Sequence, residues 1–469
     1  MPNDYWLKDH FVGPKDTIRT VAKVISKSGI GVAIVVDRNQ KMIGYVQDSD
    51  IRRAIFSDID LSSPIEKIMS RHPFTLRLGM TRSEMLEAMR KAKRLRAPVV
   101  DDRGVVCEIA LYWKMQDALS SSDFYIERKG YKKKSIRPLV LVVGGAGYIG
   151  SVLCRLLLAN GFAVRVLDKL IYGEDPLKDL LGHDHFELIR GDILHTDTVV
   201  SAVFGVDTVV NLAAIVGDPA CALDESGTIM INYISAKMLA DISKHMKVDR
   251  YIFASTCSVY GASKGKRMLT EKSPLNPVSL YAETKLKTEW GVLELADKNF
   301  SPCVLRLATV FGLSPRPRFD LIVNLFTASA FTQKNLTVFG GNQYRPNIHV
   351  EDAARAFMAC VSAPKRKIHG QVFNAGSSEL NYTIREIAER VAKLVPGTTI
   401  TQQDCAEDLR DYMVSFEKIR KVLGFACHKS IEDGVREIFQ VLKWQAIRDP
   451  NQAQYSNFKT TFAKMFVEI

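Results

Sequence analysis

The sequence has 469 residues, which is more than one ordinary hydrophobic core accommodates, so we expect two or three domains. Its hydrophobic content of 46% and charged content of 25% are typical of a globular protein, and its apolar runs are too short to span a membrane. The net charge of +12 favours phosphorylated ligands, although a solvated basic surface explains it as well, and the lack of an arginine-rich tract argues against nucleic-acid binding.

The eight cysteines are scattered along the chain without a C-x-x-C pair. This distribution indicates free thiols in a reducing compartment and no zinc site. The N-terminal residues MPNDYWLKDHF lack the basic and apolar regions of a secretory signal. We therefore expect a cytoplasmic protein with no membrane segment and no bound metal.

An internal repeat occupies residues 13 to about 120. Each copy combines a helical pattern with two short apolar strands that a polar turn separates. The expected elements are helices at 17–28 and 82–93, strands at 32–37, 42–46, 97–101 and 105–109, and a helix from about residue 49. Two tandem α-β-β-α copies resemble a cystathionine-β-synthase-type (CBS) domain pair, which we place at residues 1–125.

The resemblance to CBS pairs implies a regulatory site for an adenine nucleotide in the cleft between the copies. In the first copy, GYVQDSDIRRAI matches the family pattern, which puts Asp50 at the position of a ribose-binding aspartate and Gln47 in place of a common threonine. Arg52 is a candidate phosphate contact, with a solvated helix face as the alternative. The second copy, EIALYWKMQDAL, lacks the expected glycine and acidic residue, so at most one nucleotide site is expected. A repeat that only dimerises is the alternative.

A basic linker is expected at residues 126–137, where Lys132, Lys133 and Lys134 follow one another. We interpret it as a solvated hinge between domains. The next domain is expected at 138–445, and a C-terminal tail at 446–469.

The stretch LVLVVGGAGYIG, residues 139–150, predicts a buried strand, a glycine turn and the start of a helix. Gly144, Gly147 and Gly150 have the spacing G-x-x-G-x-x-G, which suits a tight turn with a pyrophosphate close to the backbone, where a Cβ has no room. The helix expected from Tyr148 and Ile149 would point its free N–H groups at the phosphates. A glycine motif alone is weak evidence, so the interpretation depends on the residues that follow.

The second strand, at 163–167, ends in Asp168, at about the 20-residue distance typical of dinucleotide-binding folds. A carboxylate there can accept hydrogen bonds from both hydroxyls of an adenosine ribose and repels a 2′-phosphate, which predicts NAD rather than NADP. Lys169 follows and would soften this preference slightly. An ordinary aspartate at a strand end is the alternative.

Later strands supply the remaining candidate cofactor contacts. A strand at 186–189 leads to Asp192 and Ile193, of which Asp192 is placed to meet the adenine edge. A strand at 206–214 ends in Leu212, Ala213 and Ala214, where small side chains let the cofactor lie against the backbone. Strands that alternate with helices at this rhythm predict a doubly wound parallel sheet.

The segment YAETK places Tyr281 and Lys285 four residues apart on an expected helix, and therefore on one face. A phenol with a pKa near 10 is a poor base at neutral pH. The neighbouring ammonium and a positively charged nicotinamide would favour the phenolate and lower that pKa. Y-x-x-x-K is common by chance, but here it follows STCSVYG on a predicted dinucleotide fold.

From about residue 138 to 445 the chain resembles the extended short-chain dehydrogenase/reductase family, and within it the nucleotide-sugar epimerases and dehydratases of the UDP-galactose 4-epimerase type. The matching segments are GGAGYIG, Asp168, GDI, NLAA, STCSVYG, YAETK, LRLATVFG and RPNIHVEDAARA. The resemblance implies an α/β architecture with a Rossmann-type NAD-binding core at about 138–310 and a C-terminal substrate subdomain, mostly 311–445, for a nucleotide-diphosphate sugar.

The resemblance also implies roles for individual residues. Thr256 would bond the reacting sugar hydroxyl, Tyr281 would be the acid/base, and Lys285 would bind the nicotinamide ribose. The implied substrate residues are Thr256, Thr309, Asn324, Arg345, Arg410 and Tyr412. Of these, Arg345 matches a residue that contacts the nucleotide diphosphate.

Departures from the family pattern bear on the reaction. Dehydratases of this type carry Asp-Glu after the catalytic threonine, whereas this chain has Cys257 and Ser258, which disfavours 4,6-dehydration. Thr309 stands where many epimerases have asparagine, and SPRPRFDLIVNLF differs from the better-known epimerases, so the substrate stays open. We expect a C4 epimerase, with a C4 dehydrogenase or ketoreductase as the alternative; a non-catalytic nucleotide or redox sensor is disfavoured. The family resemblance further implies a homodimer or homotetramer.

Overall fold

The computed structural model describes residues 7–28, 31–57, 59–92, 94, 96–111, 137–261, 268–403 and 411–465. The chain divides into two compact units, Met1–Ile136 with Leu194–Phe204, and Arg137–Ile193 with Gly205–Ile469. Nearly all of the expected linker and the candidate residue Arg410 lie outside the described residues. In the described part of the chain, no helix has the length and apolar character needed to cross a membrane.

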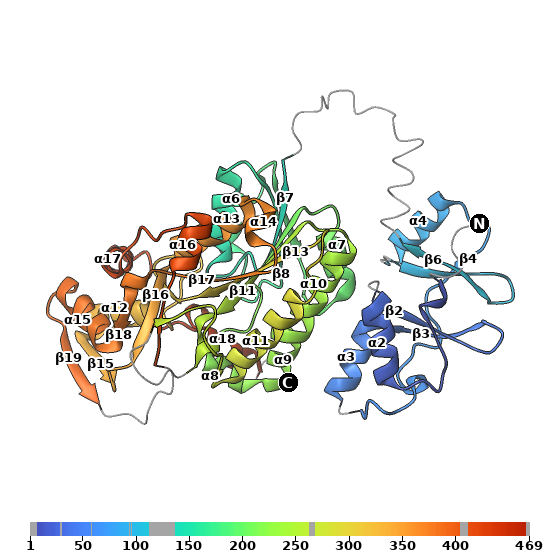
Figure 1. Ribbon diagram of the computed structural model, residues 1–469, viewed down its shortest axis with the longest axis horizontal. Coiled ribbons are helices and arrows are strands. Elements are labelled where there is room, and N and C mark those ends of the chain that lie inside the picture. The colour runs from blue at the N-terminus through green and yellow to red at the C-terminus, as the bar shows by residue number, and fades with distance from the viewer. Residues whose placement is uncertain are drawn as a thin grey trace. The chain divides into compact units, whose positions relative to one another are not determined.

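Two three-stranded sheets of the same construction form most of the first unit (Figure 1). In each, a two-residue strand runs parallel to a central strand, which pairs with the third strand in antiparallel fashion. The strands are β1 (Phe11–Val12), β2 (Val32–Val36), β3 (Met42–Gln47), β4 (Leu76–Arg77), β5 (Arg96–Val100) and β6 (Val106–Leu111), and the helices are α2 (Ile18–Ser28), α3 (Asp48–Phe56), η1 (Ile65–Lys67) and α4 (Arg82–Lys91). The predicted repeat is present, and β1 and β4 were too short to produce a recognisable sequence pattern.

A seven-stranded parallel sheet is the centre of the second unit, in the order β17-β13-β11-β10-β7-β8-β9. Its strands are β7 (Leu139–Val143), β8 (Ala163–Asp168), β9 (Phe186–Arg190), β10 (Thr208–Asn211), β11 (Arg250–Thr256), β13 (Ser301–Leu307) and β17 (Gln371–Ala375). Val140, Leu141 and Val142 are fully buried, as expected for a strand that helices cover on both faces. The doubly wound parallel sheet that the sequence predicts is therefore confirmed.

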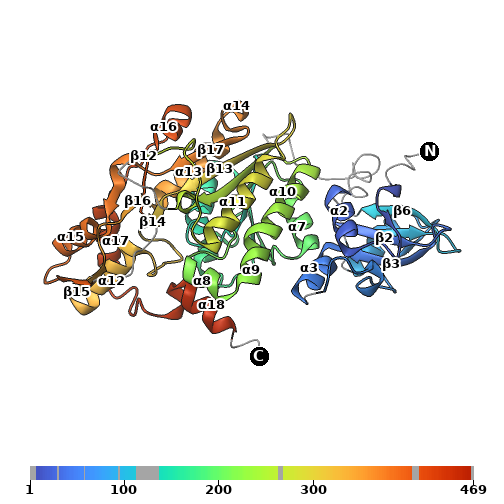
Figure 2. The same cartoon turned by 60° about the horizontal axis from the view of Figure 1, so that its bottom comes forward.

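Helices lie on both faces of this sheet (Figures 1 and 2). One face carries α6 (Gly150–Ala159) and α13 (Val350–Ser362), which pack against each other, and the other carries α10 (Ala236–His245) and α11 (Leu280–Leu293). The shorter helical segments of this unit are η2 (Asp175–Leu180), α8 (Asp218–Leu223), α9 (Glu225–Ile229), η3 (Met230–Ser235), η4 (Cys257–Tyr260), α14 (Lys365–Ile368), η5 (Ser378–Leu380) and α16 (Glu417–Leu423). Helix α7 (Thr196–Val203) belongs to the first unit.

The strand order reverses at β7, because the chain moves from it first to β8 and β9 and afterwards to β10 on the opposite side. In open parallel sheets, the crevice for a ligand lies at the carboxyl ends of the strands at such a point. The glycine turn follows β7 and the segment 212–214 follows β10, so the topology brings the two together. Helix α6 begins at Gly150 rather than at Tyr148, and β10 ends at Asn211, before the three residues that we expected to be its last.

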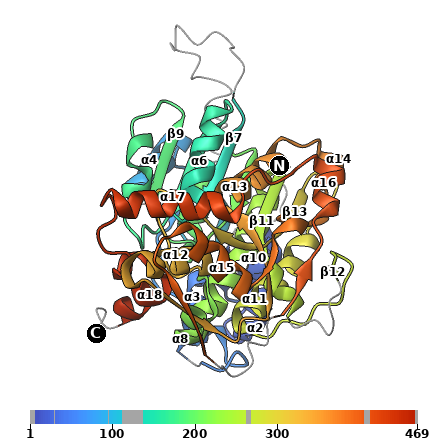
Figure 3. The same cartoon turned by 90° about the vertical axis from the view of Figure 1, so that its left-hand side faces the viewer.

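A smaller layer completes the second unit (Figure 3). Helices α12 (Ile322–Gln333), α15 (Ile384–Leu394) and α17 (Ile431–Lys443) pack together around an apolar cluster that includes Val323, Ile387 and Val435. The accompanying strands are β12 (Met268–Leu269), β14 (Thr309–Phe311), β15 (Asn335–Phe339), β16 (Tyr344–His349), β18 (Asn381–Thr383), β19 (Thr399–Gln403) and β20 (Met413–Val414).

The segment that we expected to be a C-terminal tail is structured. It contains the short helix η6 (Ala453–Tyr455) and helix α18 (Asn457–Met465), and α18 packs beside α8 (Figure 2). Helix α8 follows the Leu212–Ala214 segment, so α18 lies against the part of the molecule that was expected to bind the cofactor.

Candidate active site

The glycine turn has the close backbone packing that its sequence predicts. Gly144 has a φ of +84°, and a Cβ built there would lie 2.9 Å from the backbone nitrogen of Ala213. A Cβ at Gly150 would lie 2.3 Å from the carbonyl oxygen of Gly144. Glycine is therefore required at both positions, where the first turn of α6 and the segment after β10 approach the turn.

Asp168, at the end of β8, fastens the glycine turn to the loop that follows the strand. Its Oδ2 accepts a hydrogen bond from the backbone N–H of Ala146 at 2.9 Å, and its Oδ1 accepts one from that of Leu170 at 2.7 Å. Burial raises the pKa of this carboxyl, and the two N–H donors oppose that shift. Next to it, Lys169 forms an ion pair of 3.0 Å with Asp192, so two predicted cofactor residues contact each other.

A cavity of about 620 Å³ lies beside the glycine turn. The predicted cofactor residues that line it are Gly144, Gly147, Tyr148, Ile149, Gly150, Leu212 and Ala214, and the predicted catalytic and substrate residues are Thr256, Tyr281, Lys285, Thr309, Arg345 and Tyr412. Asp168, Lys169, Asp192, Ile193, Ala213 and Asn324 are not in its wall. Residues that are far apart in the sequence therefore form one site.

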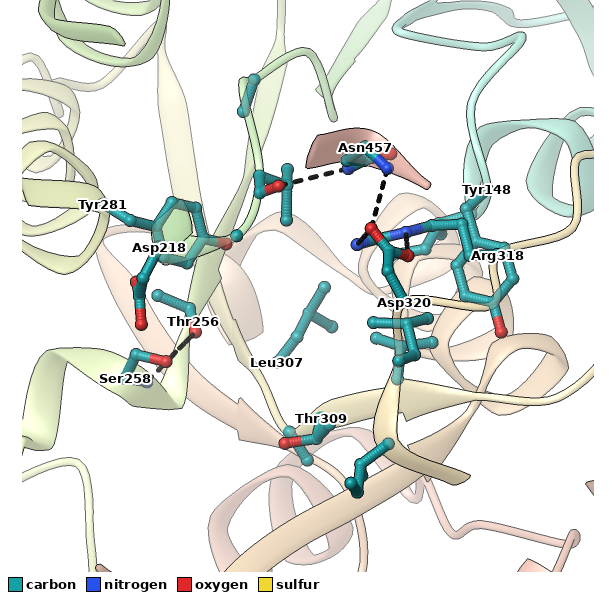
Figure 4. A pocket seen from close by; sticks show the side chains of 18 of the residues that line it. Tyr148, Asp218, Thr256, Ser258, Tyr281, Leu307, Thr309, Arg318, Asp320 and Asn457 are labelled. Carbon is teal, nitrogen blue, oxygen red and sulfur yellow. Dashed lines mark hydrogen bonds and ion pairs between the residues drawn. The ribbon is translucent and has the colours of Figure 1, made fainter. Parts of the chain in front are cut away.

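The three predicted catalytic residues come from two adjacent elements. Thr256 is the last residue of β11, and Tyr281 and Lys285 lie one turn apart on α11. Ser279 caps the N-terminus of α11, because its side chain accepts a hydrogen bond from Ala282 N at 3.3 Å. Tyr281 and Thr256 face the same space (Figure 4). Lys285 Nζ donates a hydrogen bond to the carbonyl oxygen of Ala254 at 2.8 Å and lies 6.0 Å from the centroid of the Tyr281 ring.

The pKa of Tyr281 differs from the expected direction. Burial raises it, with smaller contributions of the same sign from Cys221 and Asp218, whereas Arg318 and Thr256 act to lower it. Burial also lowers the pKa of the Lys285 ammonium to about 8. The expected lowering by Lys285 is absent in the protein alone, because the loss of hydration outweighs the neighbouring cations.

A buried polar network lies directly behind the catalytic residues. Arg306 donates hydrogen bonds to Glu289 from Nε at 3.0 and 3.1 Å and from Nη2 at 2.7 Å. Ser255, next to Thr256, also donates to Glu289, and Arg306 Nη1 donates to the Tyr260 hydroxyl at 3.1 Å. The network ties β11, α11 and β13 together and so determines where Thr256 and Tyr281 lie.

The two residues after Thr256 have different surroundings. Cys257 is buried and donates from Sγ to the carbonyl oxygen of Arg306 at 3.3 Å. Ser258 lines the cavity, accepts a hydrogen bond from the Thr256 hydroxyl at 3.1 Å and lies 3.5 Å from the hydroxyl of Tyr412. Only the serine of this pair is therefore available to a bound ligand, and the dehydratase acid pair has no counterpart here.

Asn324 does not occupy the place that we predicted for it. Its Nδ2 donates hydrogen bonds to Tyr148 Oη at 3.1 Å and to the carbonyl oxygen of Arg318 at 2.8 Å, and its Oδ1 accepts one from Gly312 N at 2.9 Å. The side chain is 1% exposed and lies behind the cavity wall. In this structure it positions Tyr148 and Arg318 rather than facing the cavity.

Several lining residues were not among our site predictions: Tyr172, Asp218, Ser258, Arg316, Arg318, Asp320 and Asn457. Asp218 accepts a hydrogen bond from Ser279 Oγ at 2.8 Å and lies close to Tyr281 (Figure 4). Arg318 and Asp320 form a bidentate ion pair at 2.9 and 3.1 Å. The unusual segment SPRPRFD pointed to the two arginines, but no sequence pattern pointed to Asn457.

In the first unit, Asp50, which was predicted to bind a nucleotide, stabilises the start of helix α3. Its Oδ2 accepts a hydrogen bond from Gln47 N at 2.8 Å, which caps helix α3, and its Oδ1 pairs with Arg53. The side chain of Arg52 is not among the described ones. Binding of a ribose at Asp50 stays a prediction.

The residues of the cavity fit a dinucleotide such as NAD. The glycine turn lacks a Cβ at Gly144, Gly147 and Gly150, as a close phosphate requires, and it stands at the positive end of α6. Lys285 and Tyr281 line the same space. Among the described residues, no cluster of His, Cys, Asp and Glu could hold a metal ion.

Comparison with known proteins agrees with this geometry. Residues 140–376 match the NAD dependent epimerase/dehydratase family, and residues 8–57 and 65–110 match the CBS domain. Over 311 residues, 63% of this chain and 95% of the relative, the chain is 30% identical to an uncharacterized UDP-glucose epimerase of Bacillus subtilis. Over 338 residues, 67% of this chain and 97% of the relative, it is 28% identical to a dTDP-glucose 4,6-dehydratase of Streptomyces niveus.

Among solved structures, the chain is similar to UDP-glucuronic acid 4-epimerase from Bacillus cereus in complex with UDP-glucuronic acid and NAD. The TM-score is 0.59 and the identity 28%, over 65% of this chain and 99% of that one. The predicted CBS pair and Rossmann-type fold are confirmed by these matches.

Proposed function

Because the chain belongs to the NAD-dependent epimerase/dehydratase family, with NAD as its cofactor, we propose that it is a nucleotide-sugar C4 epimerase that works through a 4-keto intermediate. The observation that carries the proposal is the single cavity in which Thr256, Tyr281 and Lys285 stand beside the glycine turn. The presence of Cys257 and Ser258 after Thr256 supports epimerisation over 4,6-dehydration, since neither side chain is suited to protonate a leaving hydroxyl at neutral pH. Burial raises the pKa of the Cys257 thiol further.

In the proposed reaction, Tyr281 acts as the phenolate, which the positive charges of Lys285 and of the nicotinamide of bound NAD would favour, and removes the proton of the sugar 4-hydroxyl while the Thr256 hydroxyl bonds the same oxygen. Bound NAD, which the glycine turn and Lys285 would hold, would supply the acceptor and then the donor of the C4 hydride. Tyr281 then returns the proton to the oxygen. Lys285 keeps a positive charge near the phenol, and its pKa of about 8 leaves it mostly protonated at neutral pH.

The substrate that we propose is a nucleoside-diphosphate sugar. Arg345 lines the cavity and its guanidinium lies 5.9 Å from the Tyr412 ring, whose hydroxyl is near Ser258. A cation in the same cavity as the catalytic residues suits a diphosphate. The named relatives act on UDP- or dTDP-sugars, which supports the class of substrate and leaves the sugar open.

The test is to incubate the purified protein with UDP-glucose, UDP-galactose, UDP-glucuronic acid and dTDP-glucose and to identify products by NMR and mass spectrometry. Epimerisation gives an isomer of unchanged mass, without net NADH, and a deuterium placed at C4 is retained in the product. Accumulation of NADH would instead assign a dehydrogenase, and a product lighter by one water would assign a dehydratase. Tyr281→Phe is the matched inactive control.

A further inference from the structure

Arg316 is a buried cation in the wall of the cavity. Its side chain is 4% exposed, its Nη2 donates a hydrogen bond to Asn457 Oδ1 at 2.8 Å, and its guanidinium lies 3.7 Å from the centroid of the Tyr172 ring. Its Nε is buried and has no hydrogen-bond partner among the described residues. The nearby carboxylate of Asp320 is already paired with Arg318.

Asp320 is bonded to Arg318 and not to Arg316, so the buried Arg316 guanidinium has no carboxylate bonded to it among the described residues. A buried guanidinium that lacks an anion is costly, and here burial lowers the pKa of Arg316 to about 10. An anionic ligand in the cavity that paired with this guanidinium would offset the cost and gain a charge-assisted hydrogen bond.

The neighbours of Arg316 belong to the cofactor side of the cavity. Its backbone N–H donates to Ser314 Oγ at 3.2 Å, and Ser314 Oγ donates to the carbonyl oxygen of Tyr148, in the glycine turn, at 2.7 Å. Tyr172 lies in the loop after β8. Figure 4 shows Asn457, Arg318 and Tyr148 on one side of the cavity and Thr256 and Tyr281 on the other.

Asn457 holds Arg316 from helix α18. Besides accepting from Arg316, it donates from its backbone to Asp320 at 2.8 Å and from Nδ2 to the carbonyl oxygen of Val216 at 3.2 Å. Val216 follows β10, so this single residue connects α18 to the cofactor side and to the segment that carries the two arginines. Asn457 lies outside residues 140–376, the part of the chain that matches the family.

We propose that Arg316 binds a diphosphate oxygen of the bound dinucleotide, and that Asn457 is its positioning residue. The diphosphate of the nucleotide sugar has the same chemistry and is the other possible source of the anion. The proposal depends on NAD binding and not on the reaction, so it can fail while the proposed epimerisation stands.

The experiment is calorimetric titration of cofactor-free wild type, Arg316→Gln and Asn457→Ala with NAD, ADP-ribose, ADP, adenosine and UDP. We expect Arg316→Gln to weaken NAD, ADP-ribose and ADP binding by about 10- to 100-fold, the range for a hydrogen bond to a charged group. Adenosine, which has no phosphate, should bind equally to all variants, and Asn457→Ala should weaken the phosphorylated ligands by a smaller factor. The matched control is Arg436→Gln, an exposed arginine on α17 that pairs with Asp433.

Three outcomes would overturn the proposal. NAD affinity equal to wild type in Arg316→Gln would remove Arg316 from the cofactor site. Weaker UDP binding with unchanged NAD binding would assign the anion to the substrate. Equal weakening for adenosine and ADP would indicate a structural role, and Arg316→Lys, which keeps the charge, would then bind no better than Arg316→Gln.

Discussion

Removal of Arg306 should destabilise the second unit more than any change on its surface. Its side chain is 5% exposed and that of Glu289 is 1% exposed, and three N–H···O contacts between 2.7 and 3.1 Å join them. Arg306→Met leaves the Glu289 carboxylate buried without its cation, and breaking a buried pair in this way typically costs about 3–5 kcal/mol. We therefore expect the unfolding midpoint of this unit to fall by on the order of 4–8 °C.

The measurement is scanning calorimetry of the full chain, in which the transition of the second unit is the one that NAD raises. The double variant Arg306→Met/Glu289→Met removes both charges, so it should recover most of the loss. A single variant that loses less than about 1 kcal/mol would refute the reasoning, as would a double variant that is as unstable as the single one. Because Ser255 bonds the same carboxylate, the single variant should also lose turnover out of proportion to its stability.

Four further outcomes are expected. Tyr281→Phe should keep its fold and NAD affinity but lose about 10²- to 10⁴-fold in turnover; near-normal turnover would exclude Tyr281 from proton transfer. Asp168 should make the protein prefer NAD over NADP in calorimetric titration, and equal or tighter NADP binding would contradict this. The folded-state pKa of Lys285, about 8, lies below the usual lysine value of 10.5, so between these two pH values the unfolded chain binds the extra proton and the residue's contribution to stability rises with pH. In Lys285→Met the denaturation midpoint should therefore rise less between pH 8 and pH 10 than it does in wild type. An equal rise in the two proteins would contradict the low pKa. An adenine nucleotide should bind the CBS pair and change substrate affinity by about 5- to 150-fold, and Asp50→Ala should abolish the effect. If AMP, ADP, ATP and guanine nucleotides leave the steady-state kinetics unchanged, the pair serves only in assembly.

The parts of the site that the sequence predicts are those in which a short segment meets a local requirement. Gly144 must adopt a φ of +84° beside Ala213, and only glycine does so easily. Tyr281 and Lys285 lie one helical turn apart, so their shared face follows from spacing alone. The alternation of apolar strands and helices likewise leads to the parallel sheet.

The parts that it does not predict depend on contacts between distant segments. Asn457 bonds Val216 across 241 residues and Asp320 across 137, and no periodicity records either contact. The raised pKa of Tyr281 in the protein without NAD was not predicted for the same reason, because burial is set by tertiary packing. Asn324, in the segment that differs from the better-known epimerases, was predicted to bind substrate, whereas its side chain donates a hydrogen bond to Tyr148. The sugar, the CBS ligand and the oligomeric state stay predictions.

The packing of α12 against α15 and α17 decides how this protein can be dissected. A fragment bounded by the family match, 140–376, would keep Phe311, Val323 and Phe326 but lose Ile387, Val391 and Val435, which cover them. The exposed apolar surface would favour aggregation, and Tyr412 and Asn457 would be missing from the cavity. A catalytic fragment must therefore extend beyond residue 376, at least through α18.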